Sequence, residues 1–218
     1  MFIGHYGVAL AAKRAAPRRS LGTYVTASVF IDLLWPVLLL AGVEHVEVVP
    51  GLLPTSALAF TSYPISHSLV MTIAWGVLFG GVVLFATRDR AGALVAGGLV
   101  VSHWLLDLLV HIPDLPIWPG GPLAGFGAWR SVGATLVLEL GTLFAGFAIY
   151  LSATSPRDRL GRILPWFLPA MVTTVWLGGL FGPPPPDWQT IAWSANLQWL
   201  FVAFAWWMDR HRAGVSPS

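Results

Sequence analysis

The chain contains no cysteine and has few charged residues. Of its 218 residues, Lys and Arg contribute 12, and Asp and Glu contribute 10. Without cysteine, disulfide bonds, thiolate zinc sites and cysteine nucleophiles are all excluded. The sequence also lacks a serine-hydrolase elbow, a phosphate-binding loop, a dinucleotide-binding fingerprint and an HExxH zinc motif. The net charge of +2 comes from a few loop arginines, so we expect no nucleic-acid partner.

Apolar residues are abundant instead. Hydrophobic residues make up 56% of the chain, and the mean hydropathy is +0.72. Apolar runs of about 20 residues, the length that crosses a bilayer, recur along the sequence. We therefore predict an all-α integral membrane protein that forms one polytopic membrane domain over residues 1–218. Its six spans are expected near residues 21–41, 66–86, 91–112, 131–152, 163–181 and 190–208.

The positions of the basic residues predict an orientation. Eleven of the twelve precede the first span or lie in alternate loops, and only Arg130 lies on the other side. By the positive-inside rule, both termini are expected on the cytoplasmic side of the inner (cytoplasmic) membrane. Residues 1–20 combine a short apolar segment with a basic loop. The apolar segment is either a helix on the membrane surface or one that dips inward and carries His5 towards the midplane.

A stripe of ionisable side chains lies in the third predicted span. His103, Asp107 and His111 are each four residues apart, so on a helix neighbouring members differ by only about 40° in direction. Ionisable groups at membrane depth are costly, and they usually face a bundle interior or a water-filled cavity. We therefore expect the function of the protein to depend on this stripe.

Other polar residues lie in or beside the remaining spans. Asp32 falls near the centre of the first span, Ser66-His67-Ser68 opens the second, Asp114 follows the third, and Glu139 is the only acidic residue of the fourth. The outer loop of residues 42–65 contains Glu44, His45 and Glu47, which we interpret as a solvated edge. This loop could lie on the outer leaflet or fold over a cavity. The fifth and sixth spans have no ionisable residue, so we expect them to be scaffold.

Imidazole and carboxylate groups together suit a divalent transition metal. Zinc is the metal we expect, with manganese and iron as alternatives, and an open catalytic site needs three protein ligands. The outer members of the stripe are about 12 Å apart along a helix, so one ion cannot bind both without a bend. One ion would use two neighbouring members and complete its shell from another segment. The candidate ligands are His5, His67, His103, Asp107 and His111, and the candidate catalytic residues are Asp32 and Glu139.

The same residues resemble a known family. His5 near the start, Asp32, Ser66-His67-Ser68-Leu69 and His103-Trp-Leu-Leu-Asp107 are similar to motifs of the YdjM-like (LexA-binding, inner-membrane hydrolase-like) predicted membrane-bound metal-dependent hydrolases. The resemblance covers roughly the first half of the chain. It implies a metal-dependent hydrolase of the inner membrane. The chain departs from the family pattern at Tyr63-Pro64-Ile65, where an Arg-Gly type of lead-in is expected.

Three functions remain open at this point. The first is a metal-dependent hydrolase whose site opens in the outer half of the bilayer and acts on a lipid or another membrane-associated ester or phosphoester. Asp32 or Glu139 would then orient a ligand or take a proton from the attacking water. The second is an ion- or proton-coupled permease that uses the same residues as a relay, although the chain has no clear internal repeat. The third is a non-catalytic membrane scaffold in which His–Asp pairs join helices.

Overall fold

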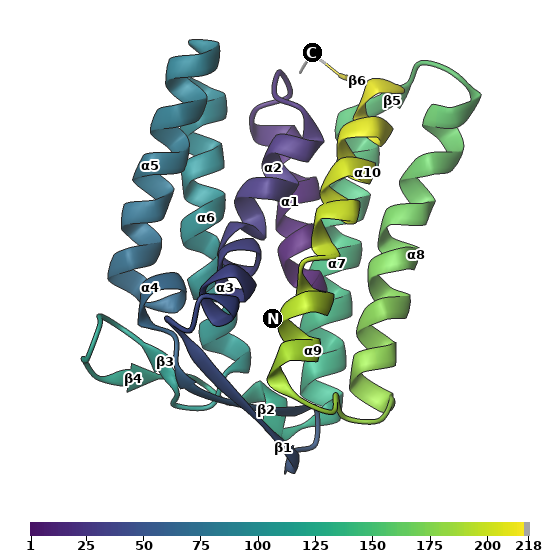
Figure 1. Ribbon diagram of the computed structural model, residues 1–218. Coiled ribbons are helices and arrows are strands. Elements are labelled where there is room, and N and C mark those ends of the chain that lie inside the picture. The colour runs from purple at the N-terminus through teal and green to yellow at the C-terminus, as the bar shows by residue number, and fades with distance from the viewer. Residues whose placement is uncertain (216–218) are drawn as a thin grey trace.

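The structure, a computed structural model, describes residues 1–215 as a helical bundle with three small two-stranded sheets (Figure 1). The helices are α1 (Ile3–Ala15), α2 (Leu21–Ser28), α3 (Phe30–Leu40), α4 (Pro64–His67), α5 (Leu69–Thr87), α6 (Arg90–Val110), α7 (Val132–Ala153), α8 (Arg159–Phe181), α9 (Trp188–Ala195) and α10 (Gln198–Arg210), with a 3₁₀ turn at Ala128–Arg130. The strands are β1 (His45–Leu53), β2 (Ser56–Ser62), β3 (Leu115–Pro116), β4 (Leu123–Ala124), β5 (Thr154–Pro156) and β6 (Arg212–Gly214). The prediction of a mainly helical chain is confirmed, and the short sheets were not predicted.

Within residues 1–215, four helices are long and apolar enough to cross a membrane: α5, α6, α7 and α8. Helices α2 and α3 meet at Val29 with a bend of 52°, and together they would make a fifth span. The segment predicted as a sixth span is instead divided into α9 and α10. Asn196 follows α9, and its side-chain amide donates to the Ala192 carbonyl at 2.8 Å. The structure therefore supports four or five spans rather than six.

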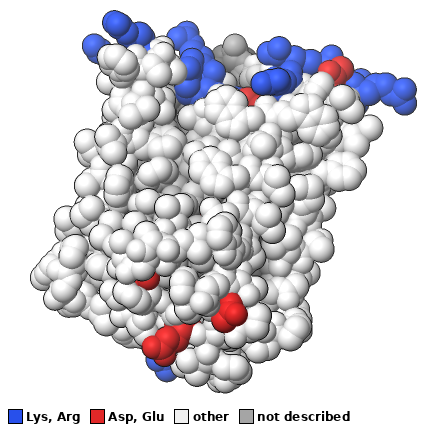
Figure 2. Space-filling model, in the orientation of Figure 1, with Lys and Arg blue, Asp and Glu red and all other residues white. Residues whose placement is uncertain are grey.

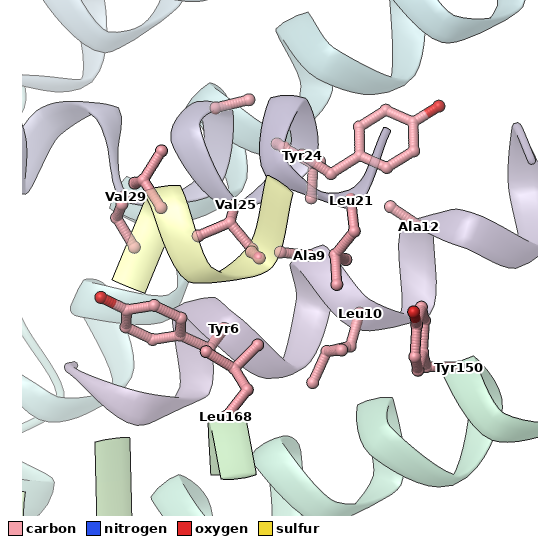
Figure 3. Packing of buried hydrophobic residues seen from close by; sticks show 14 of the residues in the cluster. Tyr6, Ala9, Leu10, Ala12, Leu21, Tyr24, Val25, Val29, Tyr150 and Leu168 are labelled. Carbon is pink, nitrogen blue, oxygen red and sulfur yellow. The ribbon is translucent and has the colours of Figure 1, made fainter. Parts of the chain in front are cut away.

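Helix α1 is buried inside the bundle, which decides between the two alternatives for the amino-terminal segment. Figure 3 shows Tyr6 and Leu10 of α1 among the packed apolar residues, with Leu21 of α2 above them and Tyr150 of α7 beside them. The label N in Figure 1 lies inside the length of the bundle, towards the end that carries β1 and β2. The segment therefore dips inward, and His5 is fully buried.

Two glycines allow α1 to lie directly against α7. A Cβ atom on Gly7 would overlap the Thr142 carbonyl, and one on Gly146 would overlap the Gly7 carbonyl. Small residues at such a crossing let two backbones approach closely, as is common between membrane helices. This contact holds α1 at a fixed depth and thereby places His5 beside α6.

Nearly all of the basic residues in Figure 2 gather at one end of the molecule, with little blue at the other, and the flank that faces the viewer carries almost no charge between the ends. The turns between α1 and α2, between α5 and α6, and between α7 and α8 lie at this end, while the β1–β2 and β3–β4 sheets lie at the other (Figure 1). This separation is the one that the positive-inside rule requires of a membrane protein. The cytoplasmic orientation of the termini stays a prediction.

The 42–65 loop forms a hairpin that folds over the end of the bundle. Strand β1 pairs with β2 in antiparallel fashion. The ring of Phe60 in β2 packs 5.5 Å from that of Trp35 and 5.0 Å from that of His111, centroid to centroid. Beside the hairpin turn, the Thr55 hydroxyl donates to the Trp129 carbonyl at 2.7 Å. Of the two alternatives for this loop, the structure thus favours the one in which it covers the bundle.

Candidate metal centre

Five ionisable side chains from four helices converge in the half of the bundle nearer the hairpin. They are His5 of α1, Asp32 of α3, His67 of α4, and His103 and Asp107 of α6. Their nitrogen and oxygen atoms form two groups within the described chain, each with all donor atoms within 4.8 Å of one another. One group contains His5, His103 and Asp107, and the other contains Asp32, His67 and His103. His103 therefore lies at the centre of the cluster.

Four donor atoms of this cluster have the mutual spacing of metal ligands. His103 Nε2 lies 3.1 Å from Asp107 Oδ2 and 3.5 Å from Asp32 Oδ1. His67 Nε2 lies 3.6 Å from Asp32 Oδ1 and 3.9 Å from Asp107 Oδ2. Ligands bound tetrahedrally at the usual zinc distances are about 3.3–3.4 Å apart. These four distances are therefore close to the spacing of donor atoms that share one small metal ion.

The hydrogen bond of His103 fixes which of its nitrogens faces the cluster. Its Nδ1 lies 2.9 Å from the carbonyl of Ser28, the last residue of α2. Because a carbonyl only accepts, Nδ1 carries the proton and Nε2 of the neutral ring has a free lone pair. Among the described residues, Nε2 is buried without a hydrogen-bond partner. This lone pair and the two nearby carboxylates repel each other unless a cation or a proton lies between them. A metal ion would remove the repulsion, so the residues fit a bound metal ion.

A buried carboxylate orients His67 in the same way. His67 Nδ1 lies 2.7 Å from Ser66 Oγ, and the Ser66 hydroxyl donates to Glu44 Oε2 at 2.6 Å. Since the single hydroxyl proton is used on Glu44, Ser66 accepts from Nδ1–H and leaves Nε2 of His67 free for the cluster. Glu44 also accepts from the backbone nitrogens of Ile65 and Ser66, both at 2.8 Å.

Glu44 is the residue that the sequence analysis missed. We interpreted it as part of a solvated edge, yet it is only 1% exposed. It lies 22 residues from Ser66, and no motif or helical spacing links the two. An outer carboxylate of this kind sets the tautomer and orientation of a ligating histidine.

We expect Ser66→Ala and Glu44→Gln each to weaken metal binding by about 10–100-fold, the usual effect of losing such an outer partner. Competition of the purified protein with a fluorescent zinc chelator would measure the affinity. Glu47→Gln is the matched control, because Glu47 is an exposed glutamate of β1, three residues after Glu44. An unchanged affinity in both test variants would show that this hydrogen-bond chain does not orient a ligand.

His5 joins the cluster from α1. Its ring stacks on that of His103 with centroids 3.8 Å apart, and its Nε2 lies 3.2 Å from Asp107 Oδ1. The amino group of Met1 also forms an ion pair with Asp107. The hydroxyl of Ser28 donates to the carbonyl of His5, so Ser28 contacts both histidines. His5 therefore reaches the stripe.

Glu139 lies at the start of α1 rather than among the donor atoms. Its two carboxylate oxygens accept from the backbone nitrogens of Phe2 at 2.8 Å and Gly4 at 2.9 Å. The first N–H groups of a helix have no partner within it, and they carry partial positive charge that a carboxylate complements. This geometry indicates that Glu139 positions α1, whereas Asp32, the other candidate catalytic residue, lies within the cluster.

His111 is separated from the other members of the stripe. Helix α6 ends at Val110, and the backbone of His111 is extended. The His111 ring lies 4.2 Å from that of Trp129, and its Nδ1 lies 2.9 Å from Asp114 Oδ1. Within the described chain, His111 belongs to neither donor group. Its prediction as a metal ligand gains no support from these distances.

A cavity of about 480 Å³ opens directly beside the cluster. Asp32, His67, Asp107 and His111 contribute to its wall, together with residues of β2, α8, α9 and α10. The predicted fifth and sixth spans, which we expected to be scaffold, therefore line the space next to the candidate metal centre. Asp32 has the most accessible carboxylate of the cluster, with a side chain 18% exposed against 2% for Asp107.

Comparison of the chain with protein-family models, curated proteins and solved structures found no match. The resemblance to the YdjM-like hydrolases therefore rests on the short motifs around His5, Asp32, His67, His103 and Asp107. The structure brings these motifs together as a buried His/Asp cluster, able to hold a metal ion, in a helical bundle with four or five apolar spans.

Proposed function

We propose that the protein is a membrane-embedded, metal-dependent hydrolase. The observation that carries this proposal is the set of four donor atoms at ligand-like spacing, with both imidazoles held by outer hydrogen bonds and a cavity beside them. The resemblance to the YdjM-like proteins implies the same activity. The proposed substrate is a lipid or another membrane-associated ester or phosphoester.

His67, His103 and Asp107 would hold the ion, and His5 is a further donor beside Asp107. Two imidazoles and one carboxylate are a donor set typical of catalytic zinc sites, so zinc is the proposed ion rather than manganese or iron. When bound, such an ion supplies Lewis-acid polarisation of a carbonyl or phosphoryl oxygen. Three protein ligands leave a position open to substrate, as in catalytic zinc sites.

Asp32 would act as the general base. Its Oδ1 lies 3.5–3.6 Å from the two ligating nitrogens, and its side chain lines the cavity. Hydrolysis adds one water across the ester bond, and the proton released by the attacking water needs an acceptor that faces the substrate. Asp32 can take that proton and return it to the leaving alcohol, which balances the reaction.

The compactness of the cluster favours a bound ion over a proton path. A relay needs groups spaced along the membrane normal, whereas the four donor atoms lie 3.1–3.9 Å apart in the pairs given above. With the basic end in the cytoplasm, the cluster would lie in the outer half of the membrane, and both termini would be cytoplasmic.

Metal-dependent hydrolysis is the test of this proposal. Detergent-purified protein should hydrolyse p-nitrophenyl esters or bis(p-nitrophenyl) phosphate, lose the activity on treatment with a chelator, and regain it when zinc is added. Magnesium added in place of zinc is the control, because it prefers oxygen ligands in octahedral geometry. A metal-loaded protein that cleaves neither substrate class, but moves protons across liposome membranes, would replace the hydrolase with the permease.

A further inference from the structure

We propose that the cavity beside the His/Asp cluster binds the apolar chain of a carboxylic ester, with the ester group at the cluster. This inference rests on the proposed hydrolase function and names its substrate class. It follows from the distribution of apolar residues in the lining, from the exposure of two of them and from the charges along the wall.

The cavity has a polar part and apolar walls. Its polar lining residues are Asp32, His67 and Asp107 of the cluster together with His111, Ser194 and Gln198, and the other lining residues are mainly apolar. The apolar walls include Leu58, Phe60, Val175, Ile191, Leu200 and Phe201. A volume of about 480 Å³ lies within the range of small-molecule sites, which bind mostly through apolar contact and use a few polar groups for orientation. An amphiphile with one reactive polar end matches this division.

Two apolar residues that line the cavity are also exposed on the outside of the bundle. Val175 of α8 is 54% exposed, and Leu200 of α10 is 64% exposed. Helix α8 is long and apolar enough to cross a membrane, so Val175 lies on a candidate membrane-spanning helix. Exposed apolar residues at that depth would contact lipid tails. An acyl chain could therefore enter from the bilayer without first crossing water.

The charges of the cavity wall favour a neutral ester over a phosphoester. Among the described residues that line it, there is no lysine or arginine. Phosphate groups are usually bound by such cations, often through paired hydrogen bonds from arginine. The amino group of Met1 lies at the wall, but it is already paired with Asp107. Apart from a metal ion, an anionic phosphodiester would thus find no lysine or arginine in this lining and would be repelled by the carboxylates of Asp32 and Asp107.

Filling the cavity provides the test. Ala195 lines the cavity at the end of α9, and Ala195→Trp would occupy part of the chain-binding space. With zinc-loaded protein, we expect kcat/KM for p-nitrophenyl palmitate to fall at least about ten-fold in this variant, because the fit of even one methylene in an apolar pocket changes this value by about 10–200-fold. The value for p-nitrophenyl butyrate should stay within about three-fold of wild type. Ala170→Trp, on the exposed surface of α8, is the matched control and should change neither value.

A binding measurement separates this inference from the hydrolase itself. Photolabelling with a diazirine-bearing palmitic acid should saturate and map to peptides that contain residues 56–62 or 191–201. Excess palmitate should compete with the label, Ala195→Trp should abolish the saturable part, and Ala170→Trp should retain it. Saturable labelling without cleavage of any ester would overturn the hydrolase and the ester assignment, while the chain-binding cavity would stand.

Two other outcomes would overturn the substrate class. Equal cleavage of butyrate and palmitate esters, with no saturable labelling, would leave a hydrolase that does not use the cavity for a chain. Preferential cleavage of bis(p-nitrophenyl) phosphate over both carboxylic esters would assign the site to phosphoesters despite the absence of arginine and lysine from the described lining.

Discussion

Replacing His103 and Asp107 together with alanine is expected to abolish metal binding. Wild-type protein purified in detergent should contain close to one zinc, manganese or iron per chain, and the double variant should fall to background. The reason is geometric: His103 belongs to both donor groups, and Asp107 lies 3.1 Å from its Nε2. Their removal leaves His67 and Asp32 as one nearby pair, which is fewer than the three protein ligands of a catalytic zinc site. Elemental mass spectrometry would measure the content.

The chain offers a matched control for this experiment. His211 and Asp158 form a His–Asp pair at the opposite end of the bundle, with Nδ1 and Oδ2 2.7 Å apart. His211→Ala/Asp158→Ala should keep the wild-type metal content. The isosteric single variant Asp107→Asn, checked by gel filtration, guards against loss of metal through misfolding. Wild-type metal content in His103→Ala/Asp107→Ala would refute the assigned ligands, and a folded wild-type protein without metal would refute the hydrolase.

Helix periodicity was sufficient to find the central part of the site. The third span was predicted at residues 91–112, and α6 covers Arg90–Val110. Inside a continuous helix, residues four apart share a face, so the spacing alone predicted that His103 and Asp107 lie close to each other. The same reasoning did not hold for His111, because Ile112 precedes Pro113 and the residue before a proline disfavours helix. The helix ends one residue before His111, and the stripe ends with it.

Contacts between distant segments could not be derived from spacing. Glu44 meets Ser66 only because the β1–β2 hairpin turns the chain back towards α4. The depth of His5 depends on the close approach of α1 to α7 at Gly7 and Gly146, which are 139 positions apart in the sequence. These contacts are tertiary, and a pattern within a single segment carries no information about them. They nevertheless decide which histidines have a nitrogen free for an ion.

The breaks between α9 and α10 and between α2 and α3 were not predicted from the sequence either. Hydropathy averages over a window, so it treated residues 190–208 as one span and did not detect the division between α9 and α10. Non-helical backbone at membrane depth is tolerated where it is buried in protein or lines a cavity. The α9–α10 break fits this rule, because Leu197 and Gln198 beside it both line the cavity. The same is true of the α2–α3 bend, where the Ser28 carbonyl accepts from His103.

Asp32→Asn is expected to slow ester hydrolysis by about 10²–10⁴-fold, the usual contribution of a general base, while the metal content stays at the wild-type level. Asparagine has nearly the shape of aspartate and keeps an oxygen that can accept a hydrogen bond, but it cannot take a proton from water. Asp32 is the one carboxylate of the cluster that combines contact with the cavity and substantial exposure, at 18%. The rate with p-nitrophenyl palmitate and the metal content should be measured on the same preparation.

The paired measurement distinguishes the two roles that Asp32 could have. If Asp32 were a required ligand, Asp32→Asn would lose metal and activity together, since an amide oxygen is a weaker ligand than a carboxylate. If it were neither base nor ligand, both would stay unchanged. Asp187→Asn is the control, because Asp187 caps α9 through a 2.7 Å hydrogen bond from Thr190 N, and asparagine caps helices equally well. Only loss of rate with retained metal assigns the proton transfer to Asp32 and leaves His67, His103 and Asp107 as the ligands.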